Sequence, residues 1–371
     1  MEQRIITKYV DIDEWIKEKN LTKILLVCDA SFRLMKIKDY FDELEKRIPV
    51  IRFDHFQPNP LYESVVEGVM MFRAQGCDAI IAVGGGSAMD VAKCIKLYAT
   101  QPQNGESSVW IGQTTEENMI PFLAMPTTAG TGSEATRYAV IYWNGAKQSI
   151  TSKSFIPETV LIDPSCLATL PIYQKKATMC DALCHAIESF WSVNSTDESK
   201  RYSRIAIQGI LDNMEGYLEN TESGNAGMLM AAHEAGKAIN ITQTTAGHAM
   251  CYKITSLFGI AHGHATILCD RVLFPWMINN TDKCIDSRGK LYLKSTFCEI
   301  AYALGCETPE QGARKLESIF EELELVVPKS TKKQFEELKT SVNPVRLKNH
   351  PIALDVDTID ILYHEILRQS E

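Results

Sequence analysis

The chain has 371 residues, of which 45% are hydrophobic and 23% charged, and its formal net charge is −9. This length predicts two domains of roughly 150–200 residues. The acidic balance argues against a nucleic-acid partner, which would need a basic face. No run of 18 apolar residues occurs, so no membrane-spanning helix is expected. The opening MEQRIITKYVDIDEW is strand-like and lacks the apolar core of a signal peptide, which predicts a cytoplasmic protein.

The first half of the chain alternates short apolar runs with helix-length segments. Apolar residues recur at helical spacing over residues 61–75 and again over 89–99. Strands separated by helices of about 10–15 residues predict βαβ units and a mostly parallel sheet. The runs expected to form strands are residues 24–27, 50–53, 79–83, 121–125 and 159–162.

The composition changes near Leu170 and Pro171. From Tyr173 onward Ala, Leu, Met, Glu and Lys dominate and β-branched runs are few, which predicts helices. We therefore expect an α/β domain over residues 1–169 and an all-α domain over residues 170–371. The Lys-rich stretch 329–339 is expected to be a solvated helix face.

Two glycine-bearing loops follow predicted strands, GGGSAMD at 84–90 and PTTAGTGSE at 126–134. The first matches neither G-x-G-x-x-G nor the Walker pattern, and taken alone it could be a ligand-free turn. Glycines let backbone N–H groups approach a phosphate, and parallel strands end at one crevice, so the pair predicts a dinucleotide site. Asp29, just after the strand at 24–27, either accepts from a ribose hydroxyl or is an ordinary turn aspartate.

The helical half contains a candidate metal site. Asp181 and His185 are four residues apart and therefore project from one face of a helix. His248, His262 and His264 follow. One carboxylate with two or three imidazoles suits Fe²⁺ or Zn²⁺ better than Mg²⁺. An Asp-x-x-x-His pair alone could equally be a capped or core histidine.

Taken together, the motifs GGGSAMDVAK, PTTAGTGSE, DALCHAIES and GHAM…AHGHA resemble the iron-containing (group III) alcohol dehydrogenase family over essentially the whole chain. The resemblance implies a dehydroquinate synthase-like fold, an α/β dinucleotide-binding domain followed by an all-helical domain, with the active site in the cleft between them. It also implies Fe²⁺ (Zn²⁺ possible), NAD(H) with NADP(H) not excluded, and a homodimer. The implied metal ligands are Asp181, His185, His248 and His262. The implied cofactor residues are Asp29, Asn59, Gly85, Gly86, Ser87, Asp90, Thr127, Thr128 and Lys147.

The chain departs from the family near the substrate. Tyr252, followed by Lys253, stands where many members carry a further histidine. Tyr252 or His264 is therefore the candidate proton donor. Arg137 stands where relatives that use neutral alcohols tend to have uncharged residues. A cationic side chain beside a metal ion costs free energy unless a negative charge compensates it. The presence of Arg137, Lys253 and His264 therefore predicts that the substrate is a compact anionic aldehyde.

The segments around these residues are similar to a branch of the family that reduces phosphonoacetaldehyde to 2-hydroxyethylphosphonate. An arginine fork and a lysine suit a phosphonate, although Arg137 and Lys253 could instead form structural ion pairs. The alternatives are a general short-chain alcohol, diol or butanol dehydrogenase, an NAD-dependent lyase resembling dehydroquinate synthase, and a binding protein without catalysis. Asp29 should repel a 2′-phosphate and so favours NADH over NADPH.

Overall fold

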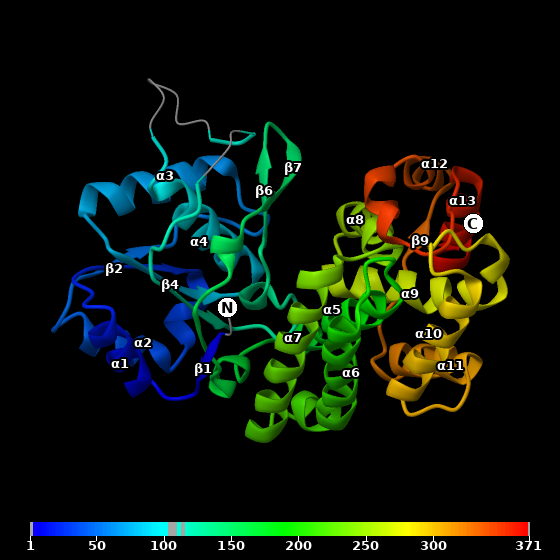
Figure 1. Ribbon diagram of the computed structural model, residues 1–371, viewed down its shortest axis with the longest axis horizontal. Coiled ribbons are helices and arrows are strands. Elements are labelled where there is room, and N and C mark those ends of the chain that lie inside the picture. The colour runs from blue at the N-terminus through cyan, green and yellow to red at the C-terminus, as the bar shows by residue number, and fades with distance from the viewer. Residues whose placement is uncertain (1–2, 103–109, 113–115, 370–371) are drawn as a thin grey trace. The chain divides into compact units, whose positions relative to one another are not determined.

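The computed structural model describes residues 3–102, 110–112 and 116–369. The chain divides into two compact units, Met1–Leu170 and Pro171–Glu371 (Figure 1). Within the described ranges, none of the helices combines the length and apolar character that crossing a membrane requires.

The first unit contains a six-stranded, fully parallel sheet in the order β1-β8-β5-β4-β2-β3. All five predicted runs are strands of this sheet, and a further strand from the N-terminal segment lies at its edge. The predicted α/β class is therefore confirmed. The strands are β1 (Arg4–Ile6), β2 (Ile24–Cys28), β3 (Val50–Phe53), β4 (Ala79–Gly84), β5 (Phe122–Pro126) and β8 (Thr159–Leu161).

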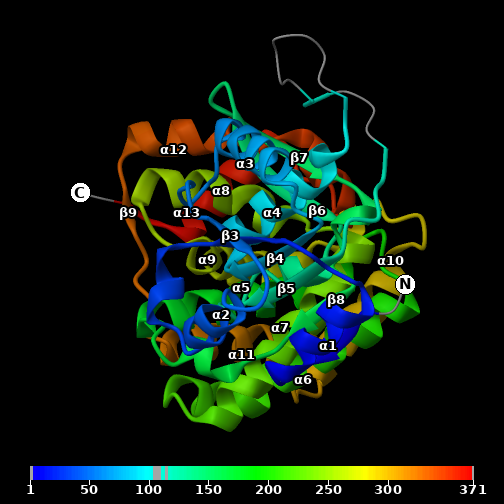
Figure 2. The same cartoon turned by 90° about the vertical axis from the view of Figure 1, so that its left-hand side faces the viewer.

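Helices cover both faces of this sheet, as Figures 1 and 2 show. Because side chains alternate along a strand, Leu25 and Val27 pack into one core layer, while Ile24 and Leu26 pack into the other. The first layer includes apolar residues of α3 (Tyr62–Gln75) and α4 (Gly86–Ala99), and the second those of α1 (Val10–Glu18) and α2 (Ile37–Leu44). Burial on both faces explains why the central strands are uninterrupted apolar runs.

An antiparallel hairpin, β6 (Tyr138–Trp143) with β7 (Ala146–Thr151), adds a second sheet that we did not predict. Its turn residues Asn144 and Gly145 have φ of 50° and 73°. Both angles are positive, as a two-residue hairpin turn requires. The short helices of this unit are η1 (Ala30–Leu34), η2 (Ser133–Ala135), η3 (Lys153–Phe155) and η4 (Pro164–Leu167).

The second unit is a bundle in which α5 packs against α6, α7 and α9. Its helices are α5 (Ile172–Trp191), α6 (Asp197–Leu218), α7 (Glu222–Thr242), α8 (Ala246–Phe258), α9 (His262–Asn279), α10 (Lys290–Ala303), α11 (Pro309–Glu322), α12 (Lys332–Lys339) and α13 (Val356–Ile366), with η5 (Thr281–Lys283) and η6 (Pro344–Asn349).

The predicted helical class of this unit is confirmed, and the unit also contains one small strand pair that we did not predict. Two short strands, β9 (Lys329–Ser330) and β10 (Arg368–Gln369), pair in parallel. Consequently only 332–339 of the Lys-rich stretch is helical. Strands of two residues are too short to leave an alternating pattern, so periodicity could not reveal them.

Helix α5 lies at the centre of the second unit. Every residue from Met179 to Trp191 is buried, which is typical of an interior helix. That stretch nevertheless includes Asp181, His185 and Glu188. Buried ionisable groups have to be paired or to bind a metal, so α5 is where a site is expected.

Candidate metal centre and cofactor-binding loops

Three of the implied ligands converge in the second unit. Asp181, His248 and His262 each place one ligand atom within 4.8 Å of the others. Asp181 Oδ1 lies 3.4 Å from His248 Nε2 and 3.9 Å from His262 Nε2. His185 borders this group, with Nε2 3.9 Å from Asp181 Oδ1 and its ring stacked on that of His248 at 4.5 Å.

The donor atoms of this group fit a divalent transition metal. Asp181 Oδ1 and His248 Nε2 are fully buried, and neither makes a hydrogen bond within the described part of the chain. Buried polar atoms seldom lack such a partner, and each exception needs an explanation. A carboxylate oxygen with imidazole nitrogens matches the ligands that Fe²⁺ and Zn²⁺ accept.

Two glycines let the ligand-bearing helices approach closely. A Cβ on Gly263 would lie 2.0 Å from the Ala177 carbonyl oxygen and 2.7 Å from Asp181 Cβ. The start of α9 therefore reaches α5 only with glycine next to His262. A Cβ on Gly247 would lie 1.9 Å from a carboxylate oxygen of Asp270, so glycine is also required next to His248.

Glu188 holds His248 from the side opposite Asp181. Its Oε1 lies 2.5 Å from His248 Nδ1 and accepts from the His248 backbone N–H at 3.0 Å. Its Oε2 accepts from the backbone N–H of Thr245 and from Thr245 Oγ1. With the Nδ1 proton directed to Glu188, Nε2 is the nitrogen available to a metal ion.

The protein groups alone favour positive charge beside Asp181. Burial by itself would raise the pKa of Asp181, but His185, His248 and His262 together hold it well below its usual range. Burial would likewise lower the pKa of His248, but Glu188 and Asp181 raise it to about 10. A divalent cation supplies the charge that this arrangement stabilises.

Aromatic and cationic groups border the His262 side of the group. The Tyr252 ring stacks on His262 with centroids 5.4 Å apart and planes 17° apart. Arg346 of η6 donates from Nη1 to the Tyr252 hydroxyl at 3.2 Å, and its Cζ lies 4.9 Å from the ring centroid. Sequence reasoning missed Arg346, because it is 94 residues from Tyr252 and belongs to none of the recognised motifs.

The structure does not bring His264 and Lys253 into the ligand group. His264 Nε2 donates to the Val326 carbonyl at 3.0 Å, so Nδ1 accepts from the Tyr173 hydroxyl, also at 3.0 Å. Burial lowers the pKa of His264. Both ring nitrogens are thus engaged within the fold. Lys253 pairs with Glu337 at 3.2 Å, which is the structural alternative considered above.

In the first unit, the two glycine-bearing loops face each other. A Cβ on Gly85 would lie 3.3 Å from Thr128, and one on Gly86 would lie 3.1 Å from Thr131. Helix α4 begins at Gly86, and no side chain caps its first turn. Its backbone N–H groups therefore remain available to an anion. Ser87 is half-buried in the same turn.

Asp29 joins these loops at the carboxyl ends of the strands. Its Oδ2 lies 3.0 Å from the position that a Cβ on Gly84 would occupy. Its Oδ1 accepts from the backbone N–H of Ser31 at 2.8 Å, which caps η1. The backbone N–H of Thr127 donates to the Gly84 carbonyl at 3.1 Å.

The remaining implied cofactor residues differ in environment. Asp90 accepts from Ser133 Oγ at 3.0 Å and from the Val140 backbone N–H at 2.9 Å. Burial raises the pKa of Asp90, and nearby cations including Lys147 oppose that rise. Asn59 is exposed and has a left-handed backbone with φ of 59°.

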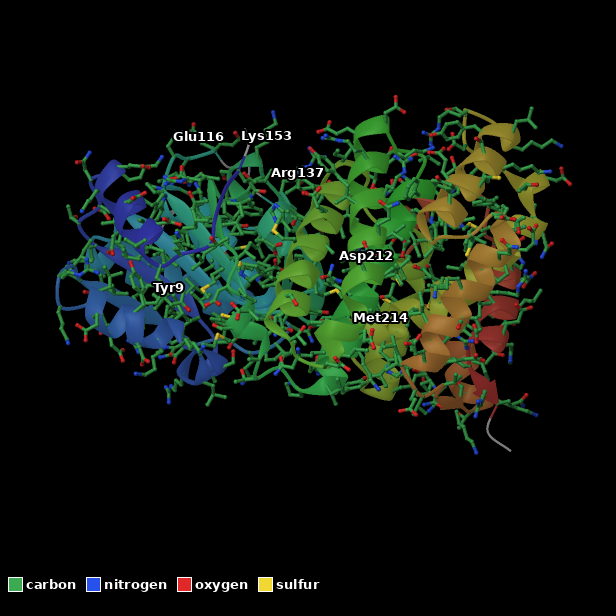
Figure 3. The ribbon with its side chains drawn as sticks, turned by 90° about the horizontal axis from the view of Figure 1, so that it is seen from below. Tyr9, Glu116, Arg137, Lys153, Asp212 and Met214 are labelled. Carbon is green, nitrogen blue, oxygen red and sulfur yellow. The ribbon has the colours of Figure 1, made fainter. Side chains whose placement is uncertain are left out.

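Arg137 lies between η2 and β6 of the first unit, where Figure 3 labels it. Its Nε donates to the Tyr138 hydroxyl at 3.2 Å, and its guanidinium lies over the Tyr138 ring. Arg137 is half-buried, so a bound molecule could still reach it.

Comparisons with known proteins match both units. The family model "Iron-containing alcohol dehydrogenase" matches residues 7–164, and "Fe-containing alcohol dehydrogenase family, C-terminal" matches residues 175–341. Alcohol dehydrogenase 4 of Schizosaccharomyces pombe is 30% identical over 301 residues, which cover 79% of this chain and 68% of that protein. Phosphonoacetaldehyde reductase of Streptomyces viridochromogenes is 30% identical over 266 residues, covering 69% and 67%. The structure of sulfoacetaldehyde reductase from Bifidobacterium kashiwanohense in complex with NAD⁺ shares the fold, with a TM-score of 0.86 at 24% identity over 99% of this chain and 96% of that one.

Proposed function

The chain belongs to the iron-containing alcohol dehydrogenase family and is an oxidoreductase; from this premise we propose that it reduces phosphonoacetaldehyde to 2-hydroxyethylphosphonate with Fe²⁺ and NADH. The chemistry rests on one observation, the convergence of the buried Asp181 and His248 with the half-buried His262. The substrate is supported by the phosphonoacetaldehyde reductase that is 30% identical. We also propose that the enzyme works as a homodimer, as the family resemblance implies.

Asp181, His185, His248 and His262 would hold the metal ion. When bound, Fe²⁺ supplies a Lewis acid that polarises the substrate carbonyl. Asp181 contributes negative charge, which both retains the cation and moderates its acidity. Glu188 fixes the ring of His248 through the Nδ1 contact, so that this ligand does not have to be ordered when the cation enters.

The facing loops of the first unit would hold the nicotinamide cofactor, which supplies the hydride. The backbone N–H groups at the start of α4 suit its pyrophosphate, and Gly85 and Gly86 allow close approach. Asp29 would accept from a ribose hydroxyl and would repel the 2′-phosphate of NADPH. We include Asn59, Ser87, Thr127, Thr128 and Lys147 in the same site as the family resemblance implies. The carboxylate of Asp90 would act there by fixing the loop through Ser133.

Proton delivery to the product is assigned to Tyr252. Its hydroxyl accepts from Arg346, and the same oxygen carries a proton that it can donate. The stacking on His262 places the Tyr252 ring beside the ligand group. His264 is the weaker candidate, because its nitrogens bond to Tyr173 and Val326.

A general alcohol dehydrogenase is the second candidate function. Alcohol dehydrogenase 4 of S. pombe is also 30% identical and matches over more of this chain. The ion pair between Lys253 and Glu337 further removes one of the cations that suggested an anionic substrate. Under this alternative a neutral aldehyde would be reduced at least as well as the phosphonate.

The test is NADH oxidation at 340 nm by Fe²⁺-loaded protein with phosphonoacetaldehyde and with propionaldehyde. We expect kcat/KM to favour the phosphonate at least a hundredfold, or about 2.7 kcal/mol of transition-state preference. Equal or better use of propionaldehyde would support the general dehydrogenase. Oxidation of NADH by neither aldehyde would favour a lyase, whose cofactor is recycled without a net absorbance change. Arg137→Ala should reduce the preference for phosphonoacetaldehyde over propionaldehyde if Arg137 contacts the phosphonate.

A further inference from the structure

Arg346 is a half-buried arginine that has no carboxylate partner among the residues that the structure describes. Arg52, Arg271 and Arg288 each form an ion pair with a carboxylate at 2.6–2.8 Å. Within the described residues, Arg346 has only the Tyr252 hydroxyl and the Tyr252 ring as partners. Only one of its N–H donors is used, although a guanidinium has five.

Arg73 also lacks a carboxylate partner, but its guanidinium donates to three backbone carbonyls, whereas that of Arg346 donates to one hydroxyl. The chain has nine more acidic than basic side chains, so carboxylates are plentiful. Removing part of a guanidinium from water without a counter-charge costs free energy. A nearby divalent cation would make that cost larger. An anion that arrives with the substrate would remove it.

The position of Arg346 relative to the ligand group limits the size of that anion. Arg346 Cζ lies 4.9 Å from the centroid of the Tyr252 ring, and this ring lies 5.4 Å from the ring of His262. Only one aromatic ring therefore separates the guanidinium from a metal ligand. A molecule with its carbonyl at the metal centre and its charge at Arg346 must be compact. A short aldehyde whose anionic group lies a few bonds from its carbonyl meets this requirement.

We propose that Arg346, held by Tyr252, is the anion subsite of the enzyme and selects two-carbon aldehydes that carry a phosphonate or sulfonate. A planar fork with several donors suits such a tetrahedral anion, which accepts charge-assisted hydrogen bonds. The subsite deepens the proposed function and depends on it for the identity of the aldehyde. It differs from the earlier candidates, because Arg137 is in the other unit and Lys253 is paired with Glu337.

Arg346→Ala and Arg346→Lys test the subsite, with Lys348→Ala as the matched control. Lys348 is exposed on the same η6 and also carries one positive charge. For Arg346→Ala we expect kcat/KM for phosphonoacetaldehyde to fall at least thirtyfold, the scale of one or two charge-assisted hydrogen bonds. Propionaldehyde carries no anionic group, so its kcat/KM should fall much less than that of phosphonoacetaldehyde. The lysine variant should recover part of the loss, since it keeps the charge but not the fork.

Binding is measured separately by calorimetry, titrating 2-hydroxyethylphosphonate into metal-loaded enzyme. Arg346→Ala should weaken this binding by a similar factor, while the Kd of NADH, followed by its fluorescence, should not change. An NADH Kd that rises by the same factor would overturn the proposal, because Arg346 would then bind the cofactor. Equal losses for both aldehydes would also overturn it, since Arg346 would only support Tyr252.

The aldehyde preference of the native enzyme tests the proposed function, and the effect of Arg346→Ala tests the subsite. If the native enzyme prefers the phosphonate and Arg346→Ala keeps that preference, the function stands and the subsite is wrong. If the native enzyme does not prefer the phosphonate, the proposed substrate is wrong. The subsite is then decided by calorimetry alone: weaker binding of 2-hydroxyethylphosphonate by Arg346→Ala supports it, and unchanged binding overturns it.

Discussion

Glu188 Oε1 lies 2.5 Å from Nδ1 of His248 and also accepts that residue's backbone N–H at 3.0 Å. One buried carboxylate thus fixes both the ring and the main chain of a proposed metal ligand. Its other oxygen bonds to Thr245 at the start of α8. Glu188 therefore orients the ligand and caps the helix that carries it.

Glu188→Gln is expected to weaken metal binding by about 10–100-fold, the usual cost of losing a carboxylate behind a ligating histidine. An amide cannot accept at both positions, so one of the buried donors loses its partner. Competition for the metal with a chelator of known affinity measures the effect, and the spectrum of a Co²⁺-substituted enzyme reports the geometry.

Glu215→Gln is the control, since Glu215 is exposed on α6 and its variant should bind metal normally. A chelator curve for Glu188→Gln that superimposes on the native one would show that the Glu188 contact does not support the metal.

His262→Ala is expected to lose metal and activity together. His262 supplies one of the three converging ligand atoms, so its truncation removes one donor from the group. Metal content by elemental analysis and aldehyde reduction are measured on the same sample. His55→Ala, at an exposed histidine of the first unit, is the control. Full turnover by a metal-free His262→Ala protein would refute the ligand assignment.

Gly263→Ala should disrupt the contact between α5 and α9. The new Cβ would lie 2.0 Å from the backbone oxygen of Ala177, and backbone cannot move aside as a flexible side chain can. We expect a loss of roughly 2–3 kcal/mol in the free energy of unfolding, together with weaker metal binding, because His262 is the adjacent residue. Thermal and chemical denaturation measure the first effect.

Gly209→Ala provides the comparison for the glycine variant. Gly209 is also helical, but the nearest atoms to its Cβ would be Ala231 Cβ at 3.1 Å and Ala231 Cα at 3.8 Å, a much milder contact, and alanine has the higher helix propensity. Its variant should be near neutral. If both variants were equally stable, the close approach of α5 and α9 would not depend on glycine.

The residues of the site differ in how far the sequence could predict them. Asp181 and His185 were identified because their spacing places them on one helix face. Glu188 is on the same helix, and its role was missed because it depends on how α8 packs against α5. Arg346 meets Tyr252 only through the tertiary fold, so no local pattern could indicate it.

The elements of the fold also differ in how far the sequence could predict them. Strands β2 and β4 are continuous apolar runs because helices cover both faces of the sheet, and these were predicted. The hairpin β6–β7 was missed even though Asn144-Gly145 is a strong two-residue turn signal. Burial alternates along much of β6, but every residue of that strand is apolar or aromatic, and β7 is mostly polar, so neither sequence shows an apolar–polar alternation.

Asp29→Ser is expected to shift the cofactor preference toward NADPH by about tenfold or more. The carboxylate at the end of β2 would repel a 2′-phosphate, and serine removes that charge. Serine can still cap η1, as Asp29 does through Ser31, so the loop should persist. The ratio of kcat/KM for NADPH to that for NADH is the measurement.

Asp54→Asn is the matched control, since Asp54 follows the neighbouring strand β3 and is exposed. It should leave the ratio unchanged. An unchanged ratio in Asp29→Ser would place the ribose hydroxyls away from Asp29.

Lys93 is expected to make the free energy of unfolding change with pH in the alkaline range. It is fully buried, and its Nζ donates to the carbonyls of Ser133 and Tyr138. Burial lowers its pKa from 10.5 to about 8, despite the opposing charge of Asp90. Between these two values the folded chain has lost the proton and the unfolded chain retains it, so unfolding takes up a proton. This group therefore makes the free energy of unfolding rise with pH above about 8.

Lys93→Met removes that titration. Chemical denaturation at several pH values from 7.5 to 9.5 should give a native slope that exceeds the variant's slope by up to about 1.4 kcal/mol per pH unit. Methionine also leaves two buried carbonyls without their donor, which lowers the free energy of unfolding at every pH. The comparison therefore uses the slope of the free energy of unfolding against pH, not its absolute value. Lys46→Met, at an exposed lysine, should keep the native slope. Parallel lines for the native protein and Lys93→Met would mean that Lys93 stays protonated in the fold.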